Sequence, residues 1–253
     1  ESEVAEFNTE EYWTITGEFQ KPGDGMFHAK LVKDHGEAPV IPNEEAAAGL
    51  LEKLRSQSWS IADMQSKEIS RSPSPPFITS SLQQEASNRL RFSAKRSMRI
   101  AQQLYEGVEL GEEGAVGLIT YMRTDSTRTS NEALGNVREF IAGQYGKEFV
   151  PDAPRSFKVK KSAQDAHEAI RPTSMEFTPQ MVRRFLNADQ YALYELIWKR
   201  FVASQMASAK MLQRTILVDG GPYQFKGVGS TYTFRGFLQV YDDFAGENSQ
   251  EIN

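Results

Sequence analysis

A tyrosine and an arginine stand two residues apart in the segment Gly117–Ser130, GLITYMRTDSTRTS. In an extended chain, side chains at positions i and i+2 point to the same side, so Tyr121 and Arg123 would lie together. A tyrosine hydroxyl has an ordinary pKa near 10, so nearby positive charge is needed to favour the nucleophilic phenolate. Arginine also forms paired hydrogen bonds to phosphate oxygens and stabilises transition-state charge. The pair suits phosphoryl transfer, although on spacing alone two surface residues of a strand are the commoner interpretation.

The residues that follow this pair concentrate hydroxyl and carboxyl groups, namely Thr124, Asp125, Ser126 and Thr127. Such residues favour turns and helix caps, because their side chains hydrogen-bond to nearby backbone groups. For Asp125, Ser126 and Thr127, the first role would be to fix the local backbone.

A basic run without an acidic residue extends from Arg89 to Arg99. Two helices joined near Phe92–Ser93 would resemble a helix-turn-helix, and the second would present Lys95, Arg96 and Arg99. A solvated charged face is the default interpretation, and salt-sensitive contacts with backbone phosphates are the alternative. For a second basic patch, Arg155–Lys161, the same two interpretations remain open.

The net charge of −5 argues at first against a nucleic-acid partner, but it is unevenly distributed. Residues 77–203 hold 18 Lys and Arg against 15 Asp and Glu, whereas the remainder holds 11 against 19. Phosphate binding depends on local fields, because charges are screened beyond about 10 Å at moderate salt. A mildly basic middle is therefore compatible with a DNA partner.

Several classes of site are disfavoured by composition. The chain has no cysteine, and its three histidines, His28, His35 and His167, are not spaced like a metal-binding pair. We therefore expect no metal site in this chain, and the lack of cysteine fits a reducing cytoplasm. No apolar run approaches the roughly 20 residues of a membrane span. Because the sequence begins at Glu1 rather than Met, we expect it to be a fragment of a longer protein.

The hydrophobic pattern predicts an α+β protein in which strand-rich ends flank a helical middle. The expected elements of the ends are a helix capped by Asn43 and strands at Glu11–Phe19, Met26–Lys33, Trp59–Arg71, Met211–Asp219, Tyr223–Val228 and Tyr232–Tyr241. Prolines 73, 75 and 76 break the chain. We expect residues 1–76 and 204–253 to form one discontinuous β-rich arch or hinge domain, and residues 77–203 to form a helical domain.

Helix starts in the middle are predicted from capping residues. The expected starts are a capping box at Ser80 and Gln83, a cap at Ser93, a capping box at Thr129 and Glu132, Thr178-Pro179, and a cap at Asp189. Gly111–Gly117 is expected to be an acidic loop.

The segment around Tyr121 closely resembles the active-site signature of type IA DNA topoisomerases. Two further matches lie in the family's order: SAKRSMRIAQQLYEG at Ser93–Gly107 and AHEAIRPT at Ala166–Thr173. The strand-rich ends, including EEYWTITGEF, resemble the family's arch domain through weaker motifs. Topoisomerase III proteins usually have proline after the tyrosine, so Tyr-Met-Arg is more similar to the bacterial topoisomerase I branch.

The resemblance implies that Tyr121 forms a covalent bond to the 5′ phosphate of a broken strand, and that Arg123 positions and neutralises that phosphate. His167 would contact DNA phosphate near the break, although alone it would fit a helix residue bonded to a local carbonyl. Arg171, one helical turn further on, would add a phosphate contact or cap the helix before Pro172. The remaining DNA-binding candidates are Lys95, Arg96, Arg99, Thr124, Asp125 and Ser126.

The implied function is relaxation of negatively supercoiled DNA in the bacterial nucleoid, by single-strand cleavage, strand passage and religation without ATP. The partners would be single-stranded and negatively supercoiled DNA. Mg²⁺ would enter through an acidic domain that finds no match here, and the family's gate domain is also missing. The chain alone is therefore expected to be inactive. The alternatives are a non-catalytic DNA-binding scaffold and, supported only by the acidic flanks, a protein-interaction module.

Overall fold

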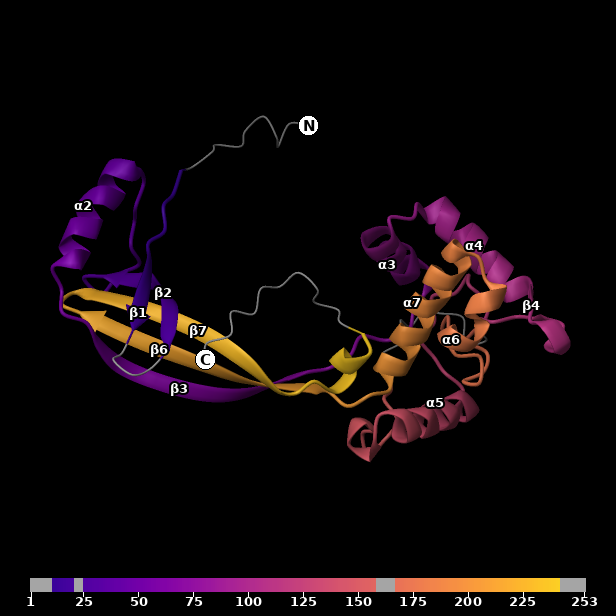
Figure 1. Cartoon of the computed structure of the whole chain (residues 1–253). Helices are drawn as coiled ribbons and strands as arrows, with labels where there is room; N and C mark the ends of the chain where they lie inside the picture. The colour runs from indigo at the N-terminus through magenta and orange to yellow at the C-terminus, as the bar shows by residue number, and fades with distance from the viewer. Residues whose placement is uncertain (1–10, 21–24, 158–166, 242–253) are drawn as a thin grey trace. The chain divides into compact units, whose positions relative to one another are not determined.

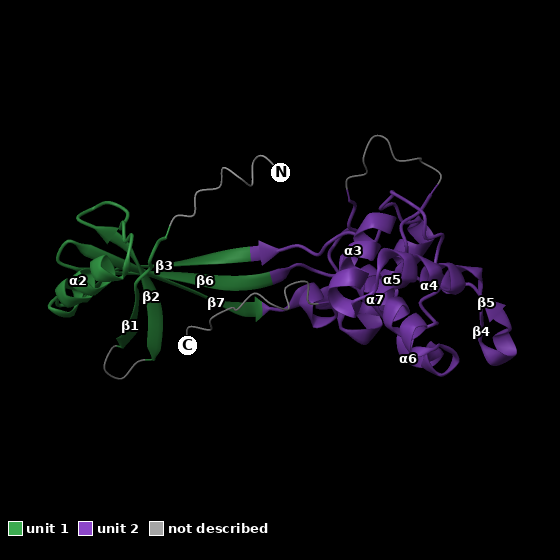
Figure 2. Ribbon diagram, turned by 90° about the horizontal axis from the view of Figure 1, so that it is seen from above, with its two compact units in different colours: residues 1–69, 210–233, 246–253 green, residues 70–209, 234–245 purple. Residues whose placement is uncertain are grey.

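The computed structural model describes residues 11–20, 25–157 and 167–241 and has the predicted α+β fold. The chain divides into two compact units (Figure 2). One comprises Glu1–Ile69, Lys210–Thr233 and Gly246–Asn253, and the other comprises Ser70–Ala209 and Phe234–Ala245. We refer to them as the β-rich unit and the helical unit. Within the described residues, the chain passes between the units after Ile69, Ala209 and Thr233.

The β-rich unit is built on a five-stranded sheet with the strand order β1-β2-β7-β6-β3 (Figure 1). Its strands are β1 (Thr16–Gln20), β2 (Met26–Asp34), β3 (Ser60–Arg71), β6 (Ala209–Gly220) and β7 (Tyr223–Phe234). The expected N-terminal hairpin is present, since β1 and β2 pair antiparallel, with Gly17 opposite Ala29. β2 also pairs antiparallel with β7, with Leu31 opposite Phe225.

Helix α2 (Glu44–Arg55) supplies part of the apolar core of this unit. As predicted, Asn43 caps the helix, and its Oδ1 accepts the N–H of Ala46 at 2.9 Å. Ala47 and Leu54 of α2 are buried in one cluster with Leu31, Val218 and Phe225 from the sheet. The alternation of buried and exposed residues along β2 and β7 thus gives α2 an apolar surface to cover.

The helical unit is organised around α7 (Ala188–Ser204), which contacts α3, α4 and α6. Its buried residues lie on all sides of the helix, as expected for a helix at the centre of a fold. The other helices are α3 (Thr79–Leu90), α4 (Ala94–Glu106), α5 (Asn131–Gln144) and α6 (Pro179–Val182). No helix in the part of the chain that the structure describes has the length and apolarity to cross a membrane.

Helices α3 and α4 are joined by Arg91, Phe92 and Ser93, with Arg91 in a left-handed conformation (φ 57°). Ser93 caps α4 as predicted, and its hydroxyl accepts the N–H of Arg96 at 3.3 Å. This short connection is compatible with the helix-turn-helix-like pair expected from the sequence.

Three predicted helix caps are wrong by one or two residues, because neighbouring polar residues compete for the same role. α3 begins after Ile78, whose N–H donates to the Ser81 hydroxyl at 3.0 Å. Ser130 caps α5, and Asn187 caps α7 in a capping box with Gln190. The caps predicted at Ser80, Thr129 and Asp189 are therefore corrected.

Two further predictions, one of a loop and one of a strand, also differ from the structure. Gly111–Gly117, expected to be a loop, contains a 3₁₀ turn at Gly111–Glu113 and β5 (Ala115–Val116), which pairs with β4 (Val108–Glu109). The strand expected at Tyr232–Tyr241 is wrong, because β7 continues to Phe234 and a 3₁₀ turn follows at Gly236–Gln239. The reason is burial: Phe237 and Leu238 of this turn are core residues of the helical unit rather than alternating sheet residues.

Candidate functional site around Tyr121

The segment that leads into Tyr121 is anchored to the end of α4. The N–H of Leu118 donates to the carbonyl of Leu104 at 2.7 Å, and the side chains of Leu118 and Ile119 are buried. The chain approaches so closely that a Cβ on Gly117 would lie 2.6 Å from the carbonyl oxygen of Tyr105. Only glycine fits this approach without displacement.

From Tyr121 to Ser126, exposed and buried side chains alternate. Tyr121, Arg123 and Asp125 are exposed, whereas Met122, Thr124 and Ser126 are buried. The Tyr121 side chain is 39% exposed and Met122 is fully buried. The segment thus presents a phenol and a guanidinium on its solvent side and anchors itself through the residues between them.

The buried hydroxyls in this segment are used within the loop. The side chain of Thr124 accepts the N–H of Ser126 at 3.1 Å, and the side chain of Ser126 accepts the N–H of Arg128 at 3.2 Å. This is the turn-fixing role predicted for Ser126, and Thr124 shares it. Both side chains are largely buried, and the DNA contact predicted for Thr124 and Ser126 stays a prediction.

Two other side chains lie beside the Tyr121 ring. The ring of Tyr105, at the end of α4, meets it edge to face with centroids 5.4 Å apart. The imidazole ring of His167 also contacts the Tyr121 ring. The two rings are tilted relative to each other, and their centroids are 6.0 Å apart. The structure therefore brings His167 to Tyr121, whereas no pattern in the sequence indicated that Tyr105 would lie there.

His167 is held there by an extended segment rather than by the expected helix. Ile119 and Pro172 form an isolated bridge, and the N–H of Thr120 donates to the carbonyl of Arg171 at 2.9 Å. On the other side, the N–H of Ile170 donates to the carbonyl of Phe77 at 2.8 Å. The helical interpretation of AHEAIRP is wrong, because Pro172 disfavours helical geometry before it and the segment pairs with the chain on both sides.

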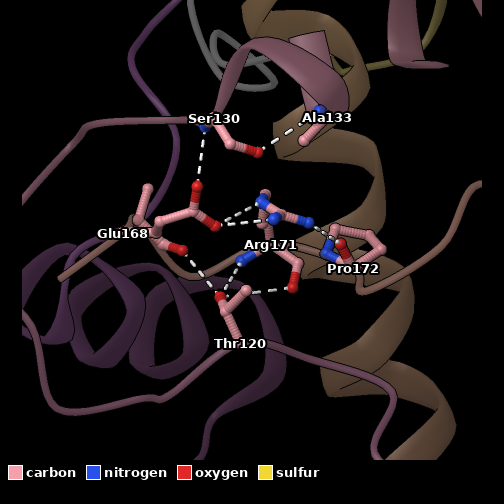
Figure 3. Close-up of polar contacts among 7 residues, drawn as sticks. Thr120, Ser130, Ala133, Glu168, Arg171 and Pro172 are labelled. Atoms are coloured by element: carbon pink, nitrogen blue, oxygen red, sulfur yellow. Dashed lines mark hydrogen bonds and ion pairs between the residues drawn. The ribbon is translucent and has the colours of Figure 1, made fainter. Parts of the chain in front are cut away.

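Glu168 and Arg171 brace this extended segment (Figure 3). The Glu168 carboxylate accepts Nη2 of Arg171 at 2.6 Å and the N–H of Ser130, the cap of α5, at 2.7 Å. Arg171 also donates to the carbonyl of Pro172 at 2.8 Å, and its side chain is only 12% exposed. Thr120 completes the cluster, since its hydroxyl donates to the carbonyl of Ala169 at 2.6 Å.

The position of Arg171 changes the interpretation of this residue. The resemblance implied a phosphate contact or a helix cap, but the described residues 167–172 form no helix that Arg171 could cap. The guanidinium is instead occupied by Glu168 and Pro172, so the structure does not bring it to the exposed face with Arg123.

We expect Arg171→Ala to lower the free energy of unfolding by about 2–4 kcal/mol, because it leaves the partly buried Glu168 carboxylate without its counter-charge. Denaturant unfolding followed by helical circular dichroism measures this, since the cluster lies in the helical unit. The control is Lys95→Ala, an exposed change expected to stay within about 0.5 kcal/mol of the unsubstituted chain. If Arg171→Ala lowered the free energy of unfolding no more than the control does, the contacts of Arg171 with Glu168 and Pro172 would not stabilise the fold.

A pocket of about 580 Å³ lies next to the exposed face of the Tyr121 segment. It is lined by Ile78, Thr79, Ser80, Gln83, Arg123, Thr124, Asp125 and His167. The first turn of α3 thus faces Arg123 and His167, and the positive end of the helix dipole adds to the Arg123 charge. Such surroundings favour a phosphate group over a neutral ligand.

The basic residues of α4 differ in availability. Lys95 and Arg99 are exposed. Arg96, by contrast, makes a bidentate ion pair with Asp189 at 2.7 and 2.9 Å and lies over the Phe92 ring. The ion pair leaves Arg96 less available to phosphate than its two neighbours.

In the second basic patch, Arg155 is also engaged internally. Its guanidinium donates to the carbonyl of Met206 and the hydroxyl of Ser208, each at 2.8 Å, and burial lowers the pKa of Arg155. Lys158, Lys160 and Lys161 lie outside the described residues.

The described residues contain no group of side chains suited to binding a metal ion. Within residues 11–20, 25–157 and 167–241, no three His, Asp or Glu side chains are grouped so that they could hold a metal ion. Asp125, the acidic residue in the pocket, therefore has no set of partner ligands there.

Comparison with known proteins identifies relatives along the whole chain. The family model described as DNA topoisomerase matches residues 1–253. DNA topoisomerase 1 of Rickettsia felis is 46% identical over 259 aligned residues, which cover 100% of this chain and 33% of that protein. DNA topoisomerase 1 of Xylella fastidiosa is 45% identical over 251 residues, covering 96% of this chain and 31% of that protein.

A solved structure of full-length topoisomerase I from Thermotoga maritima has the same fold, with a TM-score of 0.76 at 35% sequence identity. The superposition covers 94% of this chain and 37% of that one. The chain thus spans about a third of the length of the curated relatives it matches. The family match from end to end, together with the three motifs around Tyr121, shows that this chain belongs to the bacterial type IA DNA topoisomerases.

Proposed function

We propose that this chain supplies the nucleophile of an enzyme that relaxes negatively supercoiled DNA by cleaving one strand, passing another and resealing the break. The observation that carries this proposal is the exposure of Tyr121 and Arg123 on one side of a segment whose intervening residue, Met122, is buried. His167 lies against the Tyr121 ring and lines the same polar pocket as Arg123. A DNA backbone lying along this face would meet a phenol and a guanidinium together.

In the proposed reaction, the Tyr121 oxygen attacks the phosphorus of a DNA phosphodiester. The Tyr121 hydroxyl loses its proton to solvent and a bond forms between its oxygen and the 5′ phosphate. The bond from phosphorus to the 3′ oxygen breaks, and the leaving strand departs as a 3′ hydroxyl after gaining a proton from solvent. Arg123 neutralises the charge that develops on the phosphate, and His167 contacts the phosphate nearby. Resealing is the reverse attack by the 3′ hydroxyl. One phosphodiester is exchanged for another, so no ATP is required.

DNA would be held on this unit through backbone phosphates. The exposed cations Lys95 and Arg99 on α4 are the best placed of the predicted contacts, since Arg96 and Arg171 are engaged by carboxylates. Asp125 would act at the edge of the pocket, by orienting DNA or a neighbouring basic group. Such contacts tolerate any DNA sequence and weaken as salt rises.

The rest of the reaction would require parts that this chain does not carry. We propose that Mg²⁺ enters through an acidic domain supplied by the remainder of the full-length protein, which would also provide the gate. The β-rich unit would serve as a movable arch, with hinges at Ser72–Phe77 and Ala203–Lys210. The enzyme would act in the bacterial nucleoid. The whole-chain match to DNA topoisomerase 1 proteins does not favour the alternative of a non-catalytic scaffold.

Reconstitution tests the proposal. We expect the 253-residue chain alone to form no covalent adduct with a single-stranded oligonucleotide, because the acidic, metal-binding domain that the resemblance implies finds no match in this sequence. Addition of the acidic domain of a close relative with Mg²⁺ should yield a denaturant-resistant adduct that peptide mapping places on Tyr121. Rapid cleavage by the chain alone would contradict the proposal that the reaction needs a separate acidic domain and its Mg²⁺. An adduct on another residue would contradict the assignment of Tyr121.

A further inference from the structure

We propose that Thr79 is a positioning residue for DNA cleavage, whose hydroxyl fixes the two peptide groups on either side of Arg123. This inference rests on the function proposed above. Thr79 is the first residue of α3 and is distant in sequence from the segment that it binds. No local pattern in the sequence indicates this role.

One oxygen atom makes the decisive contacts. Oγ1 of Thr79 lies 2.8 Å from the carbonyl oxygen of Met122 and accepts the N–H of Thr124 at 2.9 Å. It also lies 3.0 Å from the carbonyl oxygen of Thr124, which already receives the backbone N–H of Thr79 at 2.9 Å. Because a hydroxyl has one proton, the best assignment is donation to Met122 and acceptance from Thr124.

These two partners belong to different peptide groups. The Met122 carbonyl precedes Arg123 and the Thr124 N–H follows it, so a single hydroxyl restrains the backbone on both sides of Arg123. The side chains of Met122 and Thr124 are buried as well. Within this clamped tripeptide, Arg123 has the exposed side chain, and it lines the pocket.

The hydroxyl is not needed to cap its own helix. Ile78 occupies the cap position of α3, and its N–H is satisfied by Ser81. Within the described ranges, the hydrogen bonds of Thr79 Oγ1 go to Met122 and Thr124. Thr79 lines the pocket, but its hydroxyl is occupied by this backbone, so it would act through Arg123 rather than on DNA.

The experiment uses the full-length protein and a labelled single-stranded oligonucleotide. Thr79→Val keeps the shape of the side chain but removes the hydroxyl. We expect it to slow single-turnover formation of the Tyr121 adduct by about 10- to 100-fold, as small misplacements of reacting groups do. The oligonucleotide Kd should stay within about threefold, because Arg123 is displaced rather than removed. Thr79→Ser restores the hydroxyl and should cleave within about threefold of the unsubstituted rate.

A matched control separates positioning from general damage. Thr178→Val makes the same change at the start of α6, where the hydroxyl accepts the N–H of Met181 at 3.3 Å, away from residues 122–124. We expect it to cleave at the unsubstituted rate. Thr79→Ala serves as the second variant if Thr79→Val does not fold.

Coupling to Arg123 provides the most specific readout. In an Arg123→Lys background, Thr79→Val should slow cleavage by less than about threefold, because a residue that acts through Arg123 has little left to position. The proposal is overturned if Thr79→Val cleaves normally, if Thr79→Ser is equally slow, or if the full effect persists in the Arg123→Lys background. If Tyr121→Phe still forms the adduct, the proposed function fails instead, whatever the Thr79 variants do.

Discussion

Tyr121→Phe in the full-length protein is expected to lower covalent adduct formation by a factor of at least about 10⁴, with DNA affinity within about threefold, since it removes only the attacking oxygen. The phenyl ring keeps the contacts with Tyr105 and His167, so the surrounding structure should be retained. The measurements are denaturant-resistant DNA attachment and the Kd for the same oligonucleotide.

Tyr194→Phe is the control for this substitution. Tyr194 is buried, its hydroxyl donates to the carbonyl of Phe177 at 2.6 Å, and burial raises its pKa. That phenol is inaccessible to DNA, so its removal should leave the adduct unchanged. Adduct formation that survived Tyr121→Phe would show that another residue is the nucleophile and that Tyr121 is structural.

Arg123→Ala is expected to slow cleavage by about 10²- to 10³-fold, because it removes the positive charge that is proposed to stabilise the developing oxyanion. Arg123→Lys should lose less, about tenfold, since lysine retains the charge but not the planar pair of donors. Single-turnover cleavage at saturating DNA measures the rate separately from binding.

Arg184→Ala is the matched control, because this exposed arginine lies in the 3₁₀ turn after α6, over the Phe185 ring. It removes an equal charge from the same unit and should leave the cleavage rate unchanged. If Arg123→Ala raised only the Kd, Arg123 would be a binding residue without a role in the transition state.

The α+β class and most elements of this fold were predictable, because they follow from local periodicity and capping. Asn43 and Ser93 cap helices as expected, and β1 pairs with β2. The failures arise where distant residues decide the outcome. The segment before Pro172 looks helical in isolation, but its backbone pairs with Ile119 and Phe77, and no local pattern indicates those partners.

The site was predictable only in part. Motifs placed Tyr121, Arg123 and His167 in one region, and the structure places them on one face or in ring contact. Residue type alone did not reveal that the guanidinium groups of Arg171 and Arg96 are paired with Glu168 and Asp189. It also missed Thr79, because hydrogen bonds across the fold leave no trace in a local pattern.

The alternation of exposed and buried residues after Tyr121 has a consequence for how this segment can vary. Side-chain replacements at Tyr121 or Arg123 alter the chemistry but leave the loop anchored, because the anchors are their neighbours. An insertion or deletion of one residue would exchange the two sets, turning functional groups inward and apolar ones toward solvent. A change in the length of this stretch would thus disturb its anchoring and its exposed groups at the same time.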